Sequence, residues 1–152
     1  MFVHRHPPPI VAQTLVDSCW AAALDSWSQA DPRIPHQPQA ALISRWGEGA
    51  DGGITPARKI PIIAGALGLA WGGFDRDGLG PYVYTHIQES CLFCAYTRGS
   101  YTHAVIFYGL NDTVRHQGAR VSFMDPDGGH LRTHSLDWFG SRGPYVLMRR
   151  PP

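Results

Sequence analysis

The spacing of apolar residues along the chain changes near Ser90. Before this position apolar side chains recur at helical intervals, as between Ile60 and Leu67, whereas after it β-branched and aromatic residues form short runs separated by turn residues. The first part predicts helices at 19–30 and 38–46, a third that Thr55-Pro56 opens and Gly68 stops after a bend at Pro61, and a fourth at 81–89. The second part predicts strands at 91–97, 102–110, 119–125, 130–134 and 145–149, with a helical turn at 136–139.

Helices followed by strands indicate an α+β fold with an antiparallel sheet. The Gly- and Asp-rich stretches at 48–53 and 72–80 have the composition of surface loops within one domain. We therefore expect a single domain over residues 1–152, in which residues 1–9, with their run of prolines, form an extended N-terminal arm.

Composition and charge limit the classes of partner and the cellular compartment that we expect for this protein. A formal net charge of +1 over 152 residues gives no electrostatic reason to expect nucleic acid or an anionic membrane as a partner. No signal peptide and no apolar run of about 18 residues is visible in the sequence. Three cysteines cannot all pair and suit a reducing compartment. We expect a protein that is cytoplasmic as synthesised, although delivery into another cell by a specialised secretion system leaves no such mark.

Gln13, Cys19 and His103 supply an amide donor, a thiol nucleophile and an imidazole base. Asp17 or Ser18 can cap the first helix, which places Cys19 in its first turn, where the positive end of the helix dipole favours the thiolate. The Gln13 amide lies on the segment leading into this helix. It could donate, beside the Cys19 backbone N–H, to an oxygen that becomes negative when the thiolate attacks a carbonyl.

An imidazole base needs an acceptor on its other ring nitrogen to fix its tautomer and orientation. His103 begins one predicted strand and Asp125 ends the next, so antiparallel pairing brings the two together. Asn111 and Asp112 are weaker candidates, because they lie in the intervening turn at the opposite end of the strand from His103. Asp125 is therefore the expected orienting residue.

These motifs resemble those of the papain-like cysteine peptidases. Gln13 and Cys19-Trp20-Ala21 match the oxyanion glutamine and the nucleophile motif, at the family's interval, and Thr102-His103-Ala104-Val105 matches the histidine strand. Phe123-Met124-Asp125-Pro126 with Gly128 is similar to the Asp-Pro motif of the compact bacterial branch of the family. That branch includes the peptidase domains of bacteriocin exporters and some secreted effector proteases.

The resemblance implies a papain-like fold, in which the nucleophile lies at a helix N-terminus packed on a C-terminal antiparallel sheet. It implies catalytic roles for Cys19 as nucleophile, His103 as base, Asp125 as orienting residue and Gln13 as oxyanion donor. Two departures from papain itself favour the compact branch. The third member is aspartate rather than asparagine, and Val16-Asp17 replaces the Gly-Cys pair that precedes papain's nucleophile.

The substrate groove is expected between the helix that begins at Cys19 and the sheet that carries His103. Trp20 and Thr102, the chain neighbours of these two residues, are the expected substrate-binding residues. No cofactor is expected.

Two other clusters invite a metal or redox interpretation. Cys91 and Cys94 form a Cys-x-x-Cys, but zinc needs two further ligands, and on a strand the two side chains point to opposite faces, which favours buried apolar thiols. His130 and His134 with Asp127 suggest a metal site, yet such a trio arises easily by chance among eight histidines. We expect no bound metal.

The sequence thus predicts a cysteine peptidase that acts on a protein or peptide through a covalent thioester. Deamidation of a protein glutamine, transglutamination and cleavage of a peptidoglycan cross-link use the same residues and stay open as alternatives. A non-catalytic papain-fold binding module is the alternative from another class. A bacterial effector or toxin, with an immunity protein or a secretion-system component as partner, is a hypothesis that rests only on the small domain and the missing signal peptide.

Overall fold

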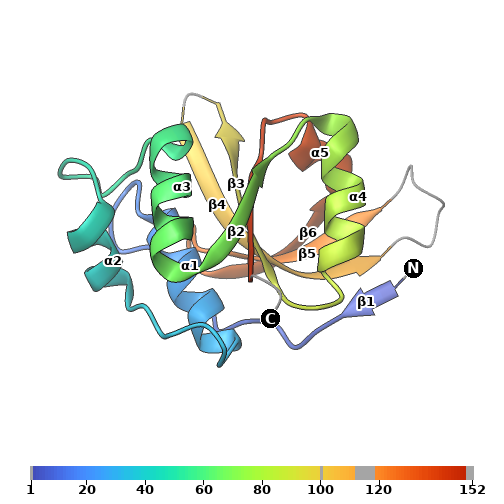
Figure 1. Cartoon of the computed structure of the whole chain (residues 1–152), viewed down its shortest axis with the longest axis horizontal. Coiled ribbons are helices and arrows are strands. Elements are labelled where there is room, and N and C mark those ends of the chain that lie inside the picture. Colours follow the sequence, from blue (N-terminus) through green and yellow to red (C-terminus); the bar gives the residue numbers. More distant parts are fainter. Residues whose placement is uncertain (1, 100, 112–118, 150–152) are drawn as a thin grey trace.

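An antiparallel β-sheet with helices on both faces forms the centre of the molecule (Figure 1). The computed structural model describes residues 2–99, 101–111 and 119–149. Within these residues seven strands pair antiparallel in the order β2-β7-β3-β4-β5-β6, and β1 pairs with the last residues of β4. The strands are β1 (Phe2–His4), β2 (Leu69–Gly73), β3 (Leu92–Arg98), β4 (Tyr101–Asn111), β5 (Arg120–Asp125), β6 (His130–Ser135) and β7 (Tyr145–Arg149).

The helices of the described residues cover both faces of this sheet. They are α1 (Cys19–Ala30), α2 (Gln39–Trp46), α3 (Pro56–Leu67), α4 (Arg76–His86) and α5 (Leu136–Gly140). Figure 1 shows α1, α2 and α3 on one side of the strands and α4 and α5 on the other. The predicted α+β class with an antiparallel sheet is confirmed. None of these helices has the length and the apolar character that a membrane span requires.

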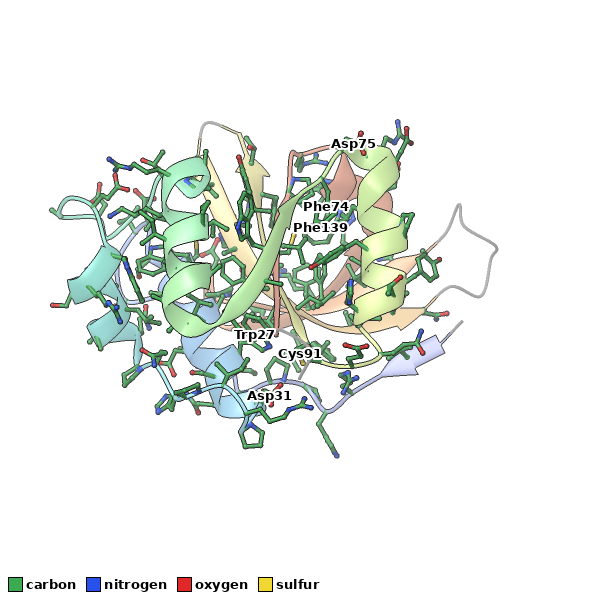
Figure 2. The ribbon with its side chains drawn as sticks, viewed as in Figure 1. Trp27, Asp31, Phe74, Asp75, Cys91 and Phe139 are labelled. Carbon is green, nitrogen blue, oxygen red and sulfur yellow. The ribbon has the colours of Figure 1, made fainter. Side chains whose placement is uncertain are left out.

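Each face of the sheet carries its own hydrophobic cluster. The first cluster, on the α1 side, contains Trp27 and Ile106, and the second, on the α4 side, contains Phe107 and Phe139. Ile106 and Phe107 are adjacent on β4 and enter different clusters because strand side chains alternate between faces. Figure 2 labels Trp27 from the first cluster and Phe139 from the second.

Helix α1 approaches the sheet closely because its N-terminal part is built from alanines. Ala21, Ala22 and Ala23 are fully buried, and their small side chains let the helix backbone lie near β4. The predicted bounds of this helix are confirmed, with Ser18 as the N-cap residue and Asp31 as the C-cap residue. The Ser18 side chain makes no capping hydrogen bond to the helix, so its hydroxyl is used elsewhere.

Helix α4 begins at Arg76, so the predicted start at Pro81 was wrong. Gly78 and Pro81 lower helix propensity, and this misled the sequence interpretation. Two features of the fold outweigh them: the Asp75 side chain caps the helix by accepting from Gly78 N at 2.7 Å, and Leu79 is buried against the sheet. The helix also ends before the predicted limit.

The surface loop expected at 72–80 was likewise wrong, because this stretch contains the end of β2 and the first part of α4. Strand β2 pairs with β7 along its whole length and was not predicted. A Cβ on Gly72 would lie 2.6 Å from Cζ of Phe74, so glycine here makes room for an aromatic ring rather than marking a loop.

The N-terminal arm is anchored at both of its ends. Phe2–His4 form β1, and the backbone N–H of Gln13 donates to Pro126 O at 2.9 Å. Between these points the arm passes over Gly129, where a Cβ would lie 3.0 Å from Cγ2 of Ile10. Gly129 has a φ of +70°, so both its backbone conformation and the close approach of the arm favour glycine.

Candidate active site

Cys19 is the first residue of α1 and lies against the start of β4. It is 4% exposed, and its Sγ lies 3.8 Å from the carbonyl oxygen of Thr102, the residue that precedes His103. Burial raises the pKa of the thiol to about 11, although hydrogen bonds from the backbone of Ala104 and Trp20 act to lower it. The resting group at neutral pH is therefore a thiol, and the helix N-terminus does not offset burial as the sequence led us to expect.

His103 and Asp125 form a buried pair at the adjoining ends of β4 and β5. His103 Nε2 lies 2.7 Å from Asp125 Oδ1, and the two side chains are 3% and 6% exposed. The contact predicted from antiparallel strand pairing is therefore present. Asp125 Oδ1 also accepts from the backbone N–H of Asp127 at 2.9 Å, and Oδ2 lies 3.2 Å from Arg132 Nε.

The charge state of Asp125 determines the tautomer of His103. Burial acts to raise the pKa of the Asp125 carboxyl, but hydrogen bonds from His103 and Asp127, together with the charge of Arg132, outweigh it and the pKa is lowered. A carboxylate that is ionised at neutral pH requires a proton on His103 Nε2. Nδ1 then remains as the basic nitrogen of the ring, free to accept a proton from a thiol.

The thiol and the imidazole come from opposite faces of the sheet. Ala104 belongs to the first cluster and Val105 to the second, so alternation places His103 on the side of Val105. There its ring makes an edge contact with Tyr96, with ring centroids 5.7 Å apart. Cys19 belongs to the first cluster. The two side chains line one cavity at the strand end, with no hydrogen bond between them among the described residues.

The Gln13 side chain is turned into its own loop. Its Nε2 donates to the carbonyl oxygens of Leu15 at 3.2 Å and Val16 at 2.7 Å, while the buried Oε1 has no hydrogen-bond partner in the described part of the chain. Gln13 lines the same cavity as the thiol, as the sequence predicted. Both of its amide protons are engaged, so service as an oxyanion donor requires the amide to turn.

Gln39 holds the segment that leads into α1, a role that the sequence did not reveal. This residue is 7% exposed. Its Oε1 accepts from Thr14 N at 2.9 Å and from Ser18 Oγ at 3.1 Å, and its Nε2 donates to Ala12 O at 3.1 Å. These bonds fix the backbone on both sides of Gln13 and the residue before the nucleophile. A glutamine at the start of a short helix carries no sequence signal for such a task.

Two cavities meet at Cys19 and form one groove. The Trp20 cavity has a volume of about 320 Å³ and the His103 cavity about 280 Å³. Both are lined by Asp17, Cys19, Tyr101 and Thr102. The Trp20 cavity adds Trp20, Gly53, Ile54, Thr55, Pro56, Ala95 and Ala104. The His103 cavity adds Gln13, Val16, His103 and Asp127.

Trp20 and Thr102 both border the groove, in different ways. Trp20 is 2% exposed and its indole N–H donates to Gly52 O at 2.7 Å, so it forms a rigid wall of its cavity. Thr102 lines both cavities and places its carbonyl beside the thiol. A larger cavity, about 490 Å³, lies between α4 and α5, on the side of the sheet away from the thiol.

The other candidate residues lie apart from this groove. Cys91 and Cys94 are free and buried, and they belong to opposite hydrophobic clusters, as predicted. His134 stacks on Trp138 with ring centroids 4.4 Å apart. The described residues contain no group of three or more His, Cys, Asp or Glu side chains placed to hold a metal ion. Asn111 ends β4 beside β1, far along the strand from His103, and the prediction for residue 112 lies outside the described residues.

A scan against models of known protein families and a search of curated proteins find no match for this chain. The chemistry open to the groove follows from its own residues. A buried thiol at a helix start lines the same cavity as an imidazole whose basic nitrogen is set by an ionised carboxylate. Such a set can pass the thiol proton to the imidazole and direct the sulfur at an electrophilic carbon.

Proposed function

We propose that this protein is a cysteine peptidase of papain-like fold, which hydrolyses peptide bonds through Cys19, His103 and Asp125. The observation that carries the proposal is the buried 2.7 Å contact between His103 Nε2 and Asp125 Oδ1, with the imidazole lining the same cavity as the thiol. A nucleophile, a base and a group that fixes the base are the components that acyl transfer to sulfur requires.

The reaction begins with transfer of the Cys19 thiol proton to His103 Nδ1. The sulfur attacks the peptide carbonyl carbon, and a C–S bond forms while the carbonyl π pair moves to oxygen. The tetrahedral intermediate collapses as the imidazolium protonates the departing amine, and the C–N bond breaks to leave a thioester. Water then attacks the thioester with His103 as base, the C–S bond breaks, and the acid and the free thiol are released.

Charge on the carbonyl oxygen is met by two donors. Cys19 is the first helical residue, so its backbone N–H has no intrahelical acceptor and is available to the oxyanion. Gln13 supplies a second N–H once its amide turns away from the carbonyls of Leu15 or Val16. The buried Oε1 accepts no hydrogen bond from the described residues, so the turn gives up no bond at that atom.

Reaction with a thiol-directed epoxide tests whether His103 activates Cys19. Cys91 is a control within the same chain, because burial raises its pKa to about 11 as well. Preferential modification of Cys19, mapped by mass spectrometry, therefore reflects a local base rather than resting acidity. We expect His103→Ala to slow labelling of Cys19 by about 100-fold. Equal labelling of Cys19 and Cys91, unaffected by His103→Ala, would instead support a binding module.

Incubation with peptides then separates peptidase from the alternative acyl transfers. We expect chain cleavage by the natural sequence and none by Cys19→Ala, measured by intact mass. A change in substrate mass without cleavage would assign a deamidase or a transglutaminase and would overturn the peptidase proposal.

A further inference from the structure

Asp17 and Tyr101 lie where the two cavities of the groove share their lining. Each lines both the Trp20 cavity and the His103 cavity, as Cys19 and Thr102 also do. A substrate whose carbonyl reaches the sulfur must therefore place neighbouring groups against the Asp17 carboxylate and the Tyr101 ring. Tyr101 is 49% exposed, so its ring is accessible to such a group.

Asp17 is held by a turn that leaves its carboxylate without a partner. Its backbone N–H donates to Asp51 O at 2.9 Å, and a Cβ on Gly53 would lie 3.1 Å from Cβ of Asp17. A Cβ at position 53 would make a tight contact, and Asp17 would have to give way by a few tenths of an ångström. Among the described residues no hydrogen bond or ion pair reaches the Asp17 carboxylate, whereas Glu48, in the loop that contains Gly53, is paired with Arg58 at 2.9 Å.

The charges that line the groove are of one sign. Neither cavity is lined by lysine or arginine. The His103 cavity contains a second carboxylate, Asp127, whose side chain is 59% exposed and lies 3.5 Å from Arg98. The Asp17 carboxylate and the accessible Tyr101 ring line the same two cavities, and each of these groups attracts a cation.

We propose that the groove selects substrates with a cationic side chain, arginine or lysine, next to the scissile carbonyl, and that Asp17 is the specificity-determining residue. The inference rests on the proposed function in that Cys19 is taken as the reacting nucleophile. Asp17 binds the ammonium or guanidinium group, and the Tyr101 ring packs against its aliphatic stem or its charged head.

Binding of the cation also assists the chemistry. Burial is the main cause of the raised pKa of Cys19, and the negative charges of Asp17 and Asp125 add to it. A positive charge beside Asp17 cancels that contribution and makes the thiol proton easier to remove. A cationic substrate is therefore attracted to Asp17 and also makes the Cys19 thiol easier to deprotonate. An acidic substrate is repelled by Asp17 and makes deprotonation of the thiol harder.

Alkylating agents of different charge test the selectivity without any requirement for hydrolysis. The probes are 2-bromoethylamine, iodoacetamide and iodoacetate, with the rate at Cys19 divided by the rate at glutathione under the same conditions. We expect the cationic probe to be favoured over the anionic one, and Asp17→Asn to reduce this preference about fivefold. Asp51 lies in the loop that contacts the Asp17 backbone but lines neither cavity, so Asp51→Asn is expected to retain the preference for the cationic probe. An unchanged preference in Asp17→Asn overturns the inference.

Peptide pairs that differ only in arginine or citrulline at positions around the scissile bond extend the test to cleavage. We expect faster cleavage of the arginine peptide, about tenfold in kcat/KM, and loss of the difference in Asp17→Asn. Cleavage of both peptides at equal rates would refute the cationic specificity and leave the peptidase proposal intact. Charge-selective alkylation without cleavage of any peptide would refute the peptidase proposal and leave the cation site intact.

Discussion

The two faces of the sheet hold their candidate site residues through different contacts. On the α1 side three fully buried alanines, Ala21 to Ala23, bring the start of the helix close to the sheet, and the Gln39 side chain makes four hydrogen bonds to the segment before α1. On the α4 side aromatic rings pack edge to face: Phe139 contacts Tyr96 and Phe107 with ring centroids 5.0 and 4.9 Å apart.

The difference shows how each half of the candidate site is held. Cys19 is positioned by backbone geometry, since a helix start, close helix packing and a hydrogen-bonded loop fix the sulfur. His103 is positioned by the Asp125 carboxylate and by the ring of Tyr96, which packs against Phe139. A cavity larger than either part of the groove lies on the aromatic side and away from the thiol, so size alone does not locate the site. Variants can therefore damage the two halves separately.

Removal of the link between the two strand ends has the largest expected effect. Asp125→Ala takes away the acceptor that holds His103 Nε2, so the ring loses both its tautomer and its orientation. We expect kcat to fall about 1,000-fold in a peptide-cleavage assay, with little change in KM. Asp125→Asn keeps one acceptor oxygen and serves as the matched variant. If the alanine variant cleaves as fast as the natural sequence, Asp125 does not orient the base.

Disruption of the aromatic packing around Phe139 has the second-largest expected effect. Phe139 is fully buried among four aromatic rings, so Phe139→Ala is expected to lower the free energy of unfolding by about 3–5 kcal/mol, measured by urea denaturation. Trp71→Ala is the control, because Trp71 is 45% exposed, and its loss is expected to change stability by about 1 kcal/mol or less. A similar loss in both variants would contradict the importance of this packing.

Disruption of the loop network on the α1 side has a smaller effect on stability and a selective one on the reaction. Gln39→Leu leaves Thr14 N and Ala12 O without partners, which is expected to cost about 1–3 kcal/mol of unfolding free energy. Because the same loop carries Gln13, we also expect kcat to fall about tenfold while KM stays near its original value. Gln37→Leu is the control, since within the described parts of the chain its side chain makes one long bond, to Pro35 O at 3.4 Å. A loss of stability without a change in kcat would separate the loop from the chemistry.

The smallest expected effect belongs to Arg132, which lies 3.2 Å from Asp125 Oδ2 and is itself 51% exposed. The folded-state pKa of Asp125 lies below its unfolded value of about 3.9, so its contribution to stability is present above that pH and is lost as pH falls through the folded pKa. Arg132→Gln raises the folded pKa and makes this contribution smaller, by about 0.5 kcal/mol or less after solvent screening.

Urea unfolding between about pH 2 and 7 measures this difference between Arg132→Gln and the natural sequence. The difference in unfolding free energy between the two proteins should be largest near neutral pH and should disappear in acid. Arg76→Gln removes an arginine that is paired with Asp137 instead and should leave the Asp125 titration unchanged. A difference in unfolding free energy that grows toward low pH would contradict stabilisation of the ionised Asp125 carboxylate by Arg132.

The elements that the sequence predicted well are those whose local signals agree with the tertiary environment. Helix α1 has its predicted bounds because a capping position precedes it and Asp31-Pro32 follows it. Strand β2 was missed because Gly72 was taken as a loop residue, and only the neighbouring Phe74 ring shows why glycine is needed there. Strand pairing also predicted the contact between His103 and Asp125, since antiparallel geometry fixes which strand ends meet.

The features that escaped prediction depend on side-chain direction and on burial. The sequence places Gln13 near the thiol but does not indicate that its amide protons are engaged by Leu15 and Val16. A helix start predicts a lowered thiol pKa, but the degree to which Cys19 is buried, and the raised pKa that results, follows only from the packed fold. The unpartnered Asp17 carboxylate likewise emerges only when the turn around Gly53 is seen.

The hydrogen bond from Gln13 N to Pro126 O joins segments that lie far apart in the sequence. In the proposed mechanism the Cys19 thiol has no proton acceptor until the strands that carry His103 and Asp125 have been synthesised and have folded against α1. A ribosome-bound chain that lacks those strands would therefore carry the thiol without its base. The proposed activity would be latent during translation, because the order of the residues delays completion of the groove.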